Sequence, residues 1–433
     1  MKTSRWLIGG VVAAVILAAP RAPAWGAKDV GGRDGNEEIY KELELFEHAL
    51  SIVRSDYVEE PQAKQLIYGA LKGMLLTLDP YSQFLDPDNY NELKVDTEGE
   101  FGGLGIEITV KDDLLTVITP IDDTPAAHAG IQPGDRIVKI DGQITRGLTI
   151  VEAVKKLRGK PNTKVALTIL REGENELKDM RLERAVIKIQ SVRAADMLED
   201  HIGYIRLSDF RERTTQDLEA AIKKLKGEQM DSLILNLRNN PGGLLDVAIT
   251  VSELFLQRHQ LIVSTKGRLK NQNQEFRSKM DGPVSGMPLV VLINEGSASA
   301  SEILAGAIQD HRRGIILGTK SHGKASVQTI FPLKDGSALR LTTSKYFTPS
   351  GRSIHGQGIL PDVLVPLEKK SEGDSKEKSK HQVEELLDQL ESGGKPADEA
   401  GNGSKKKLDN QVARAMDLLK GIKVYESKEK AVN

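Results

Sequence analysis

The stretch LVVLINEGSASASEILAGAIQD, residues 289–310, joins a short apolar run to a helical pattern through a turn of small residues. The run 289–293 is apolar throughout, as expected for a strand that is buried on both faces. Similar apolar runs alternate with helical patterns along the chain, at 202–207, 232–237 and 315–317. Because strands that alternate with helices indicate βαβ units, we expect an α/β core over residues 186–366.

The turn inside this stretch offers a nucleophile. Small residues between a strand and a helix leave a hydroxyl exposed, and the amides at the helix N-terminus stabilise an alkoxide or an oxyanion. The turn contains three candidates, Ser297, Ser299 and Ser301, and the pattern alone does not choose among them. Ser299 and Glu302 also have the spacing of a capping box, which is the ordinary structural role of a serine before a helix.

A nucleophilic serine needs a base, and the segment GTKSHGKASVQ, residues 318–328, offers two lysines. Lysine acts as a base only when its amine is neutral, and burial lowers its pKa in that direction. Gln328 lies four residues after Lys324 and could hold the amine by a hydrogen bond. The alternative for Lys320 and Lys324 is a solvated ammonium. The histidines are scattered and lack an evident carboxylate partner, at His201, His311, His322 and His355.

A second glycine-containing turn, LRNNPGGLL at residues 237–245, also ends a strand and begins a helix. The glycines let backbone amides approach a substrate carbonyl closely, so Gly242 and Gly243 are candidates for an oxyanion hole. An ordinary tight turn is the alternative for this segment.

Residues 99–183 form a separate module of glycine turns, short strands and one helical stretch. Its characteristic segments are FGGLGI at 101–106, TPAAHAG at 124–130, QPGDRI at 132–137 and DG at 141–142. Adjacent amides in such a turn can bind a carboxylate, and a strand edge beside a helix can take an added peptide strand. This succession resembles a bacterial PDZ domain, which implies a peptide-binding mainly-β module with contacts at Gly103, Leu104, Gly105 and Ile106.

Behind that module, RNNPGG, GSASASEI and GKASVQ follow one another in order. Together they resemble the C-terminal processing, or tail-specific, serine peptidases over residues 37–366. The resemblance implies a crotonase/Clp-protease-like α/β core with an inserted PDZ domain and N-terminal helices. It also implies Ser299 as nucleophile, Lys324 as base and Gln328 as the third member. The oxyanion hole would use the amide of Ala300 and that of Gly242 or Gly243.

The resemblance implies a serine endopeptidase that cleaves exported proteins near their C-termini without a metal or cofactor. Its partners would be protein substrates held by their C-terminal tails, with an adaptor or regulator as a further partner, and the PDZ domain would gate the active site. Two other interpretations are a PDZ scaffold with an inactive core and a crotonase-like acyl-CoA enzyme. Ser299, Lys324 and Gln328 together argue against the first, and a tail-binding module with an export signal argues against the second.

Patterns toward the two ends of the chain indicate export, contact between copies of the chain, and a flexible segment followed by a helix. Lys2, Arg5, an apolar run and an A-x-A site predict a signal peptide over residues 1–24, with an uncleaved membrane anchor as the alternative. Helical patterns over 37–94 predict a contact between copies of the chain, with a homodimer favoured, or a clasp on the core. A charged segment, 369–407, is expected to be flexible, and a helix is expected over 408–425.

The composition excludes several classes of function. The 433 residues are 39% hydrophobic and 28% charged, with a net charge of −2 and no cysteine. A charge this close to neutral gives no reason to expect a nucleic-acid partner. Without cysteine the chain has no disulfide, thiolate metal site, cysteine nucleophile or lipoprotein anchor. The predicted signal peptide leads us to expect a periplasmic or cell-envelope protein, attached to a membrane only through an uncleaved N-terminal segment.

Overall fold

The computed structural model describes residues 33–111, 114–171, 177–368 and 408–432. The chain forms two compact units, Met1–Leu71 and Lys72–Asn433. The predicted signal peptide and the predicted flexible segment 369–407 lie outside the described residues. Among the described helices, none combines the length and the apolar character that a membrane span requires.

The first unit contains helix α1 (Arg33–Asp56) and the beginning of α2 (Ala63–Leu76). Apolar side chains recur on α1 in steps of four, three and seven residues and lie exposed, at Ile39, Leu43, Phe46 and Val53. This spacing is that of a helix whose apolar stripe packs against another helix.

The second unit is built on a six-stranded sheet. Its strands lie in the order β10 (Val192–Met197), β11 (Ile202–Leu207), β12 (Ser232–Asn236), β15 (Leu289–Ile293), β16 (Ile315–Gly318) and β19 (Val363–Leu364). From β11 to β19 all neighbours are parallel, and β10 is antiparallel to β11. Every residue of β12 and β15 is buried, as the apolar runs predict.

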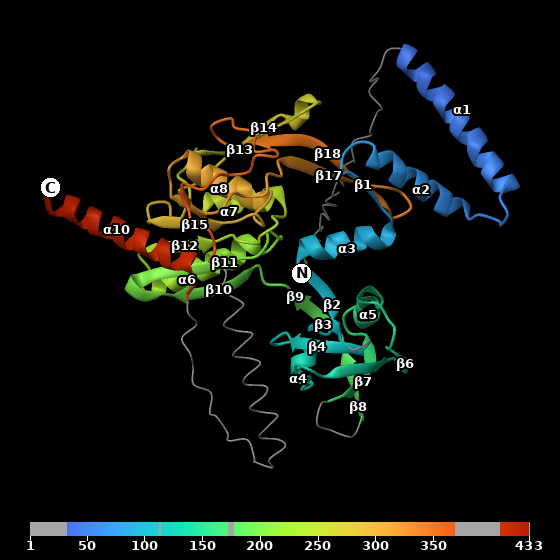
Figure 1. Ribbon diagram of the computed structural model, residues 1–433, viewed down its shortest axis with the longest axis horizontal. Helices are drawn as coiled ribbons and strands as arrows, with labels where there is room; N and C mark the ends of the chain where they lie inside the picture. Colours follow the sequence, from blue (N-terminus) through green and yellow to red (C-terminus); the bar gives the residue numbers. More distant parts are fainter. Residues whose placement is uncertain (1–32, 112–113, 172–176, 369–407, 433) are drawn as a thin grey trace, which may run out of the picture. The chain divides into compact units, whose positions relative to one another are not determined.

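Helices cover both faces of this sheet. Leu233 and Leu235 pack in one cluster with α6 (Thr214–Gly227), α7 (Leu245–Glu253) and α8 (Ala300–Asp310). Ile234, between them, belongs to a second cluster with residues of α10 (Asn410–Val432). Figure 1 shows α10 in red beside the sheet. The alternation along β12 therefore places the C-terminal helix on the face opposite α7 and α8.

An antiparallel sheet adjoins this layer. It contains β1 (Gln83–Leu85), β18 (Ala338–Phe347), β13 (Leu261–Gly267), β14 (Gln274–Arg277) and β17 (Ser326–Pro332). Two short 3₁₀ turns, Glu199–His201 and Lys270–Gln272, precede β11 and β14. Phe84 of β1 pairs with Leu339 of β18. The helical expectation for 37–94 did not include β1, because a three-residue strand leaves no readable period and its partner lies far along the chain. Helix α3 (Pro87–Glu98) follows it.

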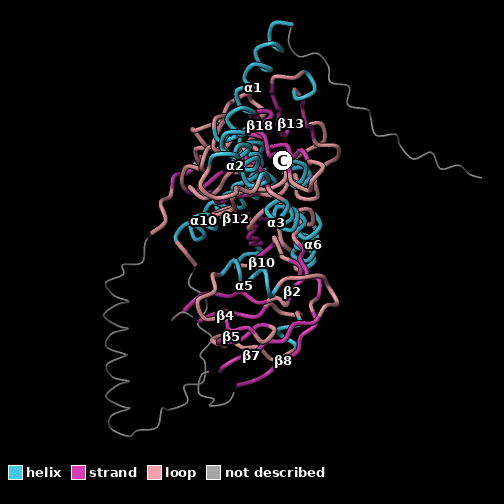
Figure 2. The backbone as a smooth tube through the Cα atoms, turned by 90° about the vertical axis from the view of Figure 1, so that its right-hand side faces the viewer, coloured by secondary structure: helices cyan, strands magenta, loops and turns pink. Residues whose placement is uncertain are grey.

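The chain leaves this core through β2 (Glu100–Gly103) and returns through β9 (Ala185–Lys188), which pair with each other. Between them lie the strands of an antiparallel sheet, seen in magenta in Figure 2: β3 (Ile106–Lys111), β4 (Leu114–Pro120), β5 (Arg136–Ile140), β6 (Gln143–Ile144), β7 (Lys164–Leu170) and β8 (Leu177–Glu183). Helices α4 (Pro125–His128) and α5 (Ile150–Leu157) accompany it. This module has its own apolar core and is inserted between β1 and the main sheet.

Candidate active site

The turn from β15 into α8 places Ser299 directly before the helix, with backbone angles φ 54° and ψ −112°. Such a left-handed conformation costs a serine about 1–3 kcal/mol and persists only where surrounding contacts enforce it. The two neighbouring serines have other roles: Ser297 Oγ donates to the Leu237 carbonyl at 2.8 Å and Ser301 Oγ to the Asn240 carbonyl at 2.9 Å. Of the three serines, Ser299 is the one that lines a cavity.

Glu302 holds the turn in the way the capping pattern predicts, because its Oε2 accepts a hydrogen bond from the Ser299 amide at 2.8 Å. The carboxylate does more than cap a helix. It is fully buried, and it also accepts from the amides of Gly323 at 2.6 Å and Lys324 at 3.0 Å. The hydroxyl of Ser321 donates to it at 2.6 Å. One carboxylate thus ties the serine turn to the segment that carries the two lysines.

Lys324 is the lysine brought to the cavity, whereas Lys320 lies exposed. The Lys324 Nζ lies 4.9 Å from the ring centroid of Tyr81. Burial and the positive charge of Arg340 lower the pKa of Lys324 below the usual value for lysine, although the charge of Glu302 acts in the opposite direction. A lowered pKa shifts Lys324 toward its neutral amine form.

Tyr346, in β18, forms a second connection between the two segments. Its hydroxyl donates to the carbonyl of Ser299 at 3.1 Å and also bonds to the carbonyl of Lys324. The Tyr346 side chain is almost fully buried. The backbones around the candidate nucleophile and the candidate base are therefore fixed from two sides, by Glu302 and by Tyr346.

The glycine turn lies against the serine. A Cβ built on Gly242 would come within 2.8 Å of both the Ser299 Cβ and the Ala300 amide nitrogen. The Gly242 amide itself donates to the side-chain oxygen of Asn240 at 2.9 Å. Among the described residues, the amides of Ala300 and Gly243 donate no hydrogen bond. The sequence had left Gly242 and Gly243 as alternatives, and this arrangement favours Gly243 as the available donor.

Gln328 also lines the cavity. Its amide nitrogen donates to Ser326 Oγ at 2.8 Å and reaches Thr342 Oγ1 at 3.5 Å. The hydrogen bond expected between Gln328 and the Lys324 amine does not occur among the described residues. The structure therefore brings Gln328 into the site but gives its amide a different partner.

The cavity that joins these groups measures about 370 Å³. Its lining is largely apolar and comes from α3, α7, α8 and β17: Leu93, Leu244, Leu245, Ile303, Val327 and Ile330. An apolar cavity with a few convergent polar groups is the usual form of a site that binds a substrate side chain. The participation of α3 could not be read from the sequence.

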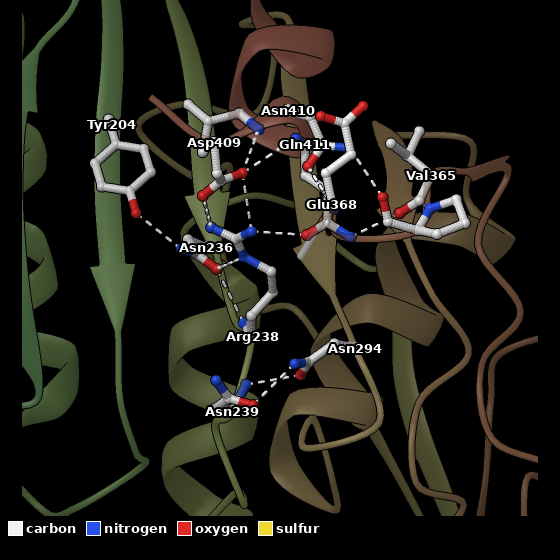
Figure 3. A network of polar contacts seen from close by, with 12 residues as sticks. Tyr204, Asn236, Arg238, Asn239, Asn294, Val365, Glu368, Asp409, Asn410 and Gln411 are labelled. Carbon is white, nitrogen blue, oxygen red and sulfur yellow. Dashed lines mark hydrogen bonds and ion pairs between the residues drawn. The ribbon is translucent and has the colours of Figure 1, made fainter. Parts of the chain in front are cut away.

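Arg238 anchors the glycine turn to the C-terminal helix (Figure 3). Its guanidinium donates to Asp409 at 2.8 and 3.1 Å and to Gln411 at 2.7 Å. The next residue, Asn239, exchanges two 2.8 Å hydrogen bonds with Asn294, which begins the serine turn. Sequence reading missed this network because its members are far apart along the chain.

In the inserted module, Gly103, Leu104, Gly105 and Ile106 line a groove of about 80 Å³ together with residues of α5. Leu104 is buried, and Gly105 has a left-handed φ of 75°. The turn thus lies just before β3 and beside α5, where a peptide strand could be added.

Comparison with known proteins agrees with this architecture. Residues 201–365 match peptidase family S41, residues 116–171 match the PDZ domain, and residues 24–89 match the N-terminal domain of the activating protease CtpB. A carboxy-terminal-processing protease of Bartonella bacilliformis is 48% identical over 346 residues, covering 78% of this chain and 79% of the relative. A carboxyl-terminal-processing protease of Synechocystis sp. is 38% identical over 323 residues, covering 72% and 74%.

The solved photosystem II D1 C-terminal processing protease is 30% identical, with 74% of this chain and 86% of that chain covered and a TM-score of 0.43. The predicted family and fold class are confirmed by the family matches and the curated relatives. With 48% identity over more than three quarters of the Bartonella relative, this chain belongs to the carboxy-terminal-processing proteases, serine peptidases of family S41 that carry a PDZ domain.

Proposed function

We propose that this peptidase works through a Ser299–Lys324 pair. The observation that carries the proposal is that Ser299, Lys324, Ala300 and the glycine pair line one cavity. The hydroxyls of Ser297 and Ser301 are directed to backbone carbonyls, so that of the three serines in this turn only Ser299 lines the cavity. The pKa of Lys324 is lowered, first by burial, and this direction favours the neutral amine that a base requires.

In the first step, neutral Lys324 takes the proton of the Ser299 hydroxyl while the oxygen bonds to the scissile carbonyl carbon. The carbonyl π electrons move to the oxygen, which becomes the oxyanion of a tetrahedral intermediate. The amides of Ala300 and Gly243 donate to that oxyanion, and a donor of this kind contributes about 3–4 kcal/mol. Asn240 keeps the neighbouring Gly242 amide turned away, which supports the choice of Gly243.

In the second step, the carbonyl re-forms, the C–N bond breaks, and the Lys324 ammonium returns its proton to the leaving amine. The acyl-enzyme that remains is an ester of Ser299. Neutral Lys324 then takes a proton from water as the water oxygen attacks the ester carbon. The ammonium protonates the departing Ser299 oxygen, so the enzyme is restored and the product is a carboxylic acid.

Single substitutions test the pair. We expect Ser299→Ala and Lys324→Ala to abolish cleavage of an unfolded protein, with new C-termini followed by mass spectrometry. Lys320→Ala is the matched control, because Lys320 lies exposed in the same segment, and it should cleave like the wild type. A serine-directed fluorophosphonate should label a peptide containing Ser299. Cleavage by Ser299→Ala at the wild-type rate would disprove the assignment.

The PDZ domain, in this proposal, binds the free C-terminal carboxylate of a substrate at the amides around Leu104, Gly105 and Ile106 and gates the active site. The groove between β3 and α5 supports it. Two peptides with the same sequence, one ending in a free acid and one amidated, separate the possibilities. We expect the free acid to be cleaved faster, and equal rates would rule out carboxylate capture.

The apolar lining of the catalytic cavity supports substrates with nonpolar tails. The N-terminal signal pattern supports export to the periplasm or cell envelope, and an adaptor remains part of the proposal.

The exposed apolar stripe of α1 supports a homodimer through this helix. Light scattering on Leu43→Glu and the wild type tests it: the dimer should dissociate in the variant, and an unchanged mass would exclude α1 as the contact.

A further inference from the structure

The ring of Tyr81 contacts the amine of Lys324, and the mechanism above gives this ring no role. Tyr81 lies in the turn of residues 79–82, between α2 and β1 in the second unit. The Lys324 Nζ is 4.9 Å from the ring centroid, within the range of a cation–π interaction. Both side chains are partly buried, so water screens the contact only in part.

Hydrogen bonds fix this turn. Asp79 Oδ1 accepts from the Tyr81 amide at 2.7 Å and from the Ser82 amide at 2.9 Å. Asp79 Oδ2 accepts from the Ser82 hydroxyl at 2.7 Å, and Thr342 of β18 donates to Oδ1 at 3.2 Å. The ring therefore faces Lys324 on a turn that is attached to the catalytic core.

Arg340, also in β18, connects the turn to the charge of the site. Its Nε donates to the Tyr81 carbonyl at 3.3 Å, and its terminal nitrogen donates to Gln83 at 2.8 Å. Two charged groups act on the Lys324 amine, Glu302 from α8 and Arg340 from β18. The Tyr81 ring faces that amine from the turn, whereas the Tyr346 hydroxyl of β18 bonds to the backbone carbonyl of Lys324. Glu302 favours the ammonium form, whereas Arg340 disfavours it.

We propose that Tyr81 receives the ammonium that forms on Lys324 when the base takes the Ser299 proton, and that Arg340 opposes it. This inference rests on the proposed function of Lys324. The electron-rich face of an aromatic ring attracts an ammonium and has little interaction with a neutral amine. The contact is therefore stronger in the transition state than in the ground state, which is the requirement for accelerating a step.

The two groups act on the base with opposite signs. Removing the ring removes a stabiliser of the ammonium, so the pKa of Lys324 should fall. Removing the Arg340 charge removes a destabiliser, so the pKa of Lys324 should rise. Because a base acts when it is deprotonated, the acidic limb of the kcat/KM profile reports this pKa for the free enzyme.

The pH profile of peptide cleavage tests the proposal. For Tyr81→Leu we expect the midpoint of the acidic limb to fall by about 0.4–1.5 pH units, and the plateau rate to drop roughly 2- to 30-fold. Tyr81→Phe keeps the ring and should retain the wild-type midpoint. Arg340→Met should move the midpoint upward, whereas Arg340→Lys keeps the charge and should move it less.

A direct titration separates failure of this inference from failure of the proposed function. The ¹³Cε resonance of Lys324 can be followed against pH in the Ser299→Ala protein, which should not cleave. In that background, adding Tyr81→Leu should lower the Lys324 pKa and adding Arg340→Met should raise it. Cleavage by Ser299→Ala itself would refute the proposed function. An unchanged Lys324 pKa after adding Tyr81→Leu would refute only the role of Tyr81.

Fluorination removes the concern that a leucine at position 81 disturbs folding. Replacing Tyr81 by 3,4,5-trifluorophenylalanine keeps the ring shape and weakens its electron-rich face. We expect it to shift the midpoint downward, as Tyr81→Leu does. If the fluorinated ring behaves like Tyr81→Phe, or if Tyr81→Leu and Arg340→Met shift the midpoint in the same direction, the inference is wrong.

Discussion

The backbone amides of Ser299 and Lys324 donate to the same oxygen, Oε2 of Glu302, at 2.8 and 3.0 Å. A nucleophile turn and a base segment that are 25 residues apart in the sequence thus share one acceptor. Because the Glu302 carboxylate is fully buried, water cannot take its place as hydrogen-bond acceptor when Glu302 is substituted. The relative position of the two proposed catalytic residues depends on this side chain.

Glu302→Gln should therefore impair both stability and catalysis. A glutamine has one acceptor oxygen, and its NH₂ group would face amide donors that then lose their acceptor. Each buried amide left unpaired costs about 1–3 kcal/mol, so we expect lower stability in urea unfolding. Fluorophosphonate labelling of Ser299 should also slow.

Glu295→Gln is the control for that experiment, because Glu295 lies exposed in the same turn. It should unfold and react like the wild type. Wild-type labelling by Glu302→Gln would show that the shared acceptor is dispensable for catalysis.

Lys324 should reduce the stability of the folded state where its amine is charged. Burial and the charge of Arg340 lower its pKa in the folded state, so the unfolded chain holds the proton more tightly. Stability then rises with pH from the lowered pKa up to the usual lysine value of 10.5. We expect Lys324→Met to stabilise the protein near neutral pH, by an amount that shrinks toward pH ~10.

Chemical unfolding at several pH values measures this difference. Lys320→Met, at an exposed position, should show no such trend. A gain from Lys324→Met that does not change with pH would mean that the folded protein does not shift the lysine pKa.

Gly242→Ala should nearly abolish acylation. An added Cβ would lie 2.7 Å from the Ala298 carbonyl oxygen and 2.8 Å from the Ser299 Cβ, and φ is 96°. The nucleophile turn or the glycine turn must move, and a displacement of about 1 Å at reacting groups costs about 10²-fold in rate. Single-turnover kinetics report the acylation step directly.

Gly351→Ala controls for backbone strain alone, since φ is 80° there and nothing lies within 4 Å of the built Cβ. It should lose some stability and keep the wild-type acylation rate. Equal acylation by the wild type and Gly242→Ala would contradict the close packing of the two turns.

Asp409 should make the docking of α10 sensitive to acid. Burial would raise the pKa of this carboxyl, but hydrogen bonds from Arg238 and from backbone amides lower it overall. A lowered carboxyl pKa stabilises the folded state above the unfolded value, and this contribution is lost as the pH falls through the folded value. Hydrogen exchange of α10 should therefore accelerate in acid.

In Asp409→Asn we expect faster exchange of α10 at neutral pH and a weaker dependence on acid. Asp200→Asn is the matched control, because the ion pair between Asp200 and Lys420 also involves α10 but lies exposed. Identical exchange in Asp409→Asn and the wild type would exclude a role for the carboxylate in docking the helix.

Sequence patterns predicted the layers of this protein better than its site. The runs at 232–237 and 289–293 read as buried strands because helices cover both faces, and the family and fold class that followed are confirmed. The choice of Ser299 over Ser297 and Ser301 needed family resemblance. The reason lies in hydrogen bonds to the carbonyls of Leu237 and Asn240, which no local pattern reveals.

Long-range contacts explain what the sequence did not show. Glu302 could be predicted only as a helix cap, because its other donors come 19 to 22 residues later. Tyr81 gave no signal, since its contact with Lys324 depends on β1 pairing with β18. The amide of Gln328 donates to Ser326, two residues away, rather than to Lys324 as the expected geometry required.

The link between Arg238 and Asp409 also has a consequence for biogenesis. The Arg238 side chain is only 12% exposed, and its carboxylate partner is supplied 171 residues later. During synthesis, Ser299, Lys324 and the glycine turn leave the ribosome before Asp409 and α10 do. The order of synthesis thus leaves Arg238 without its carboxylate partner until Asp409 has emerged.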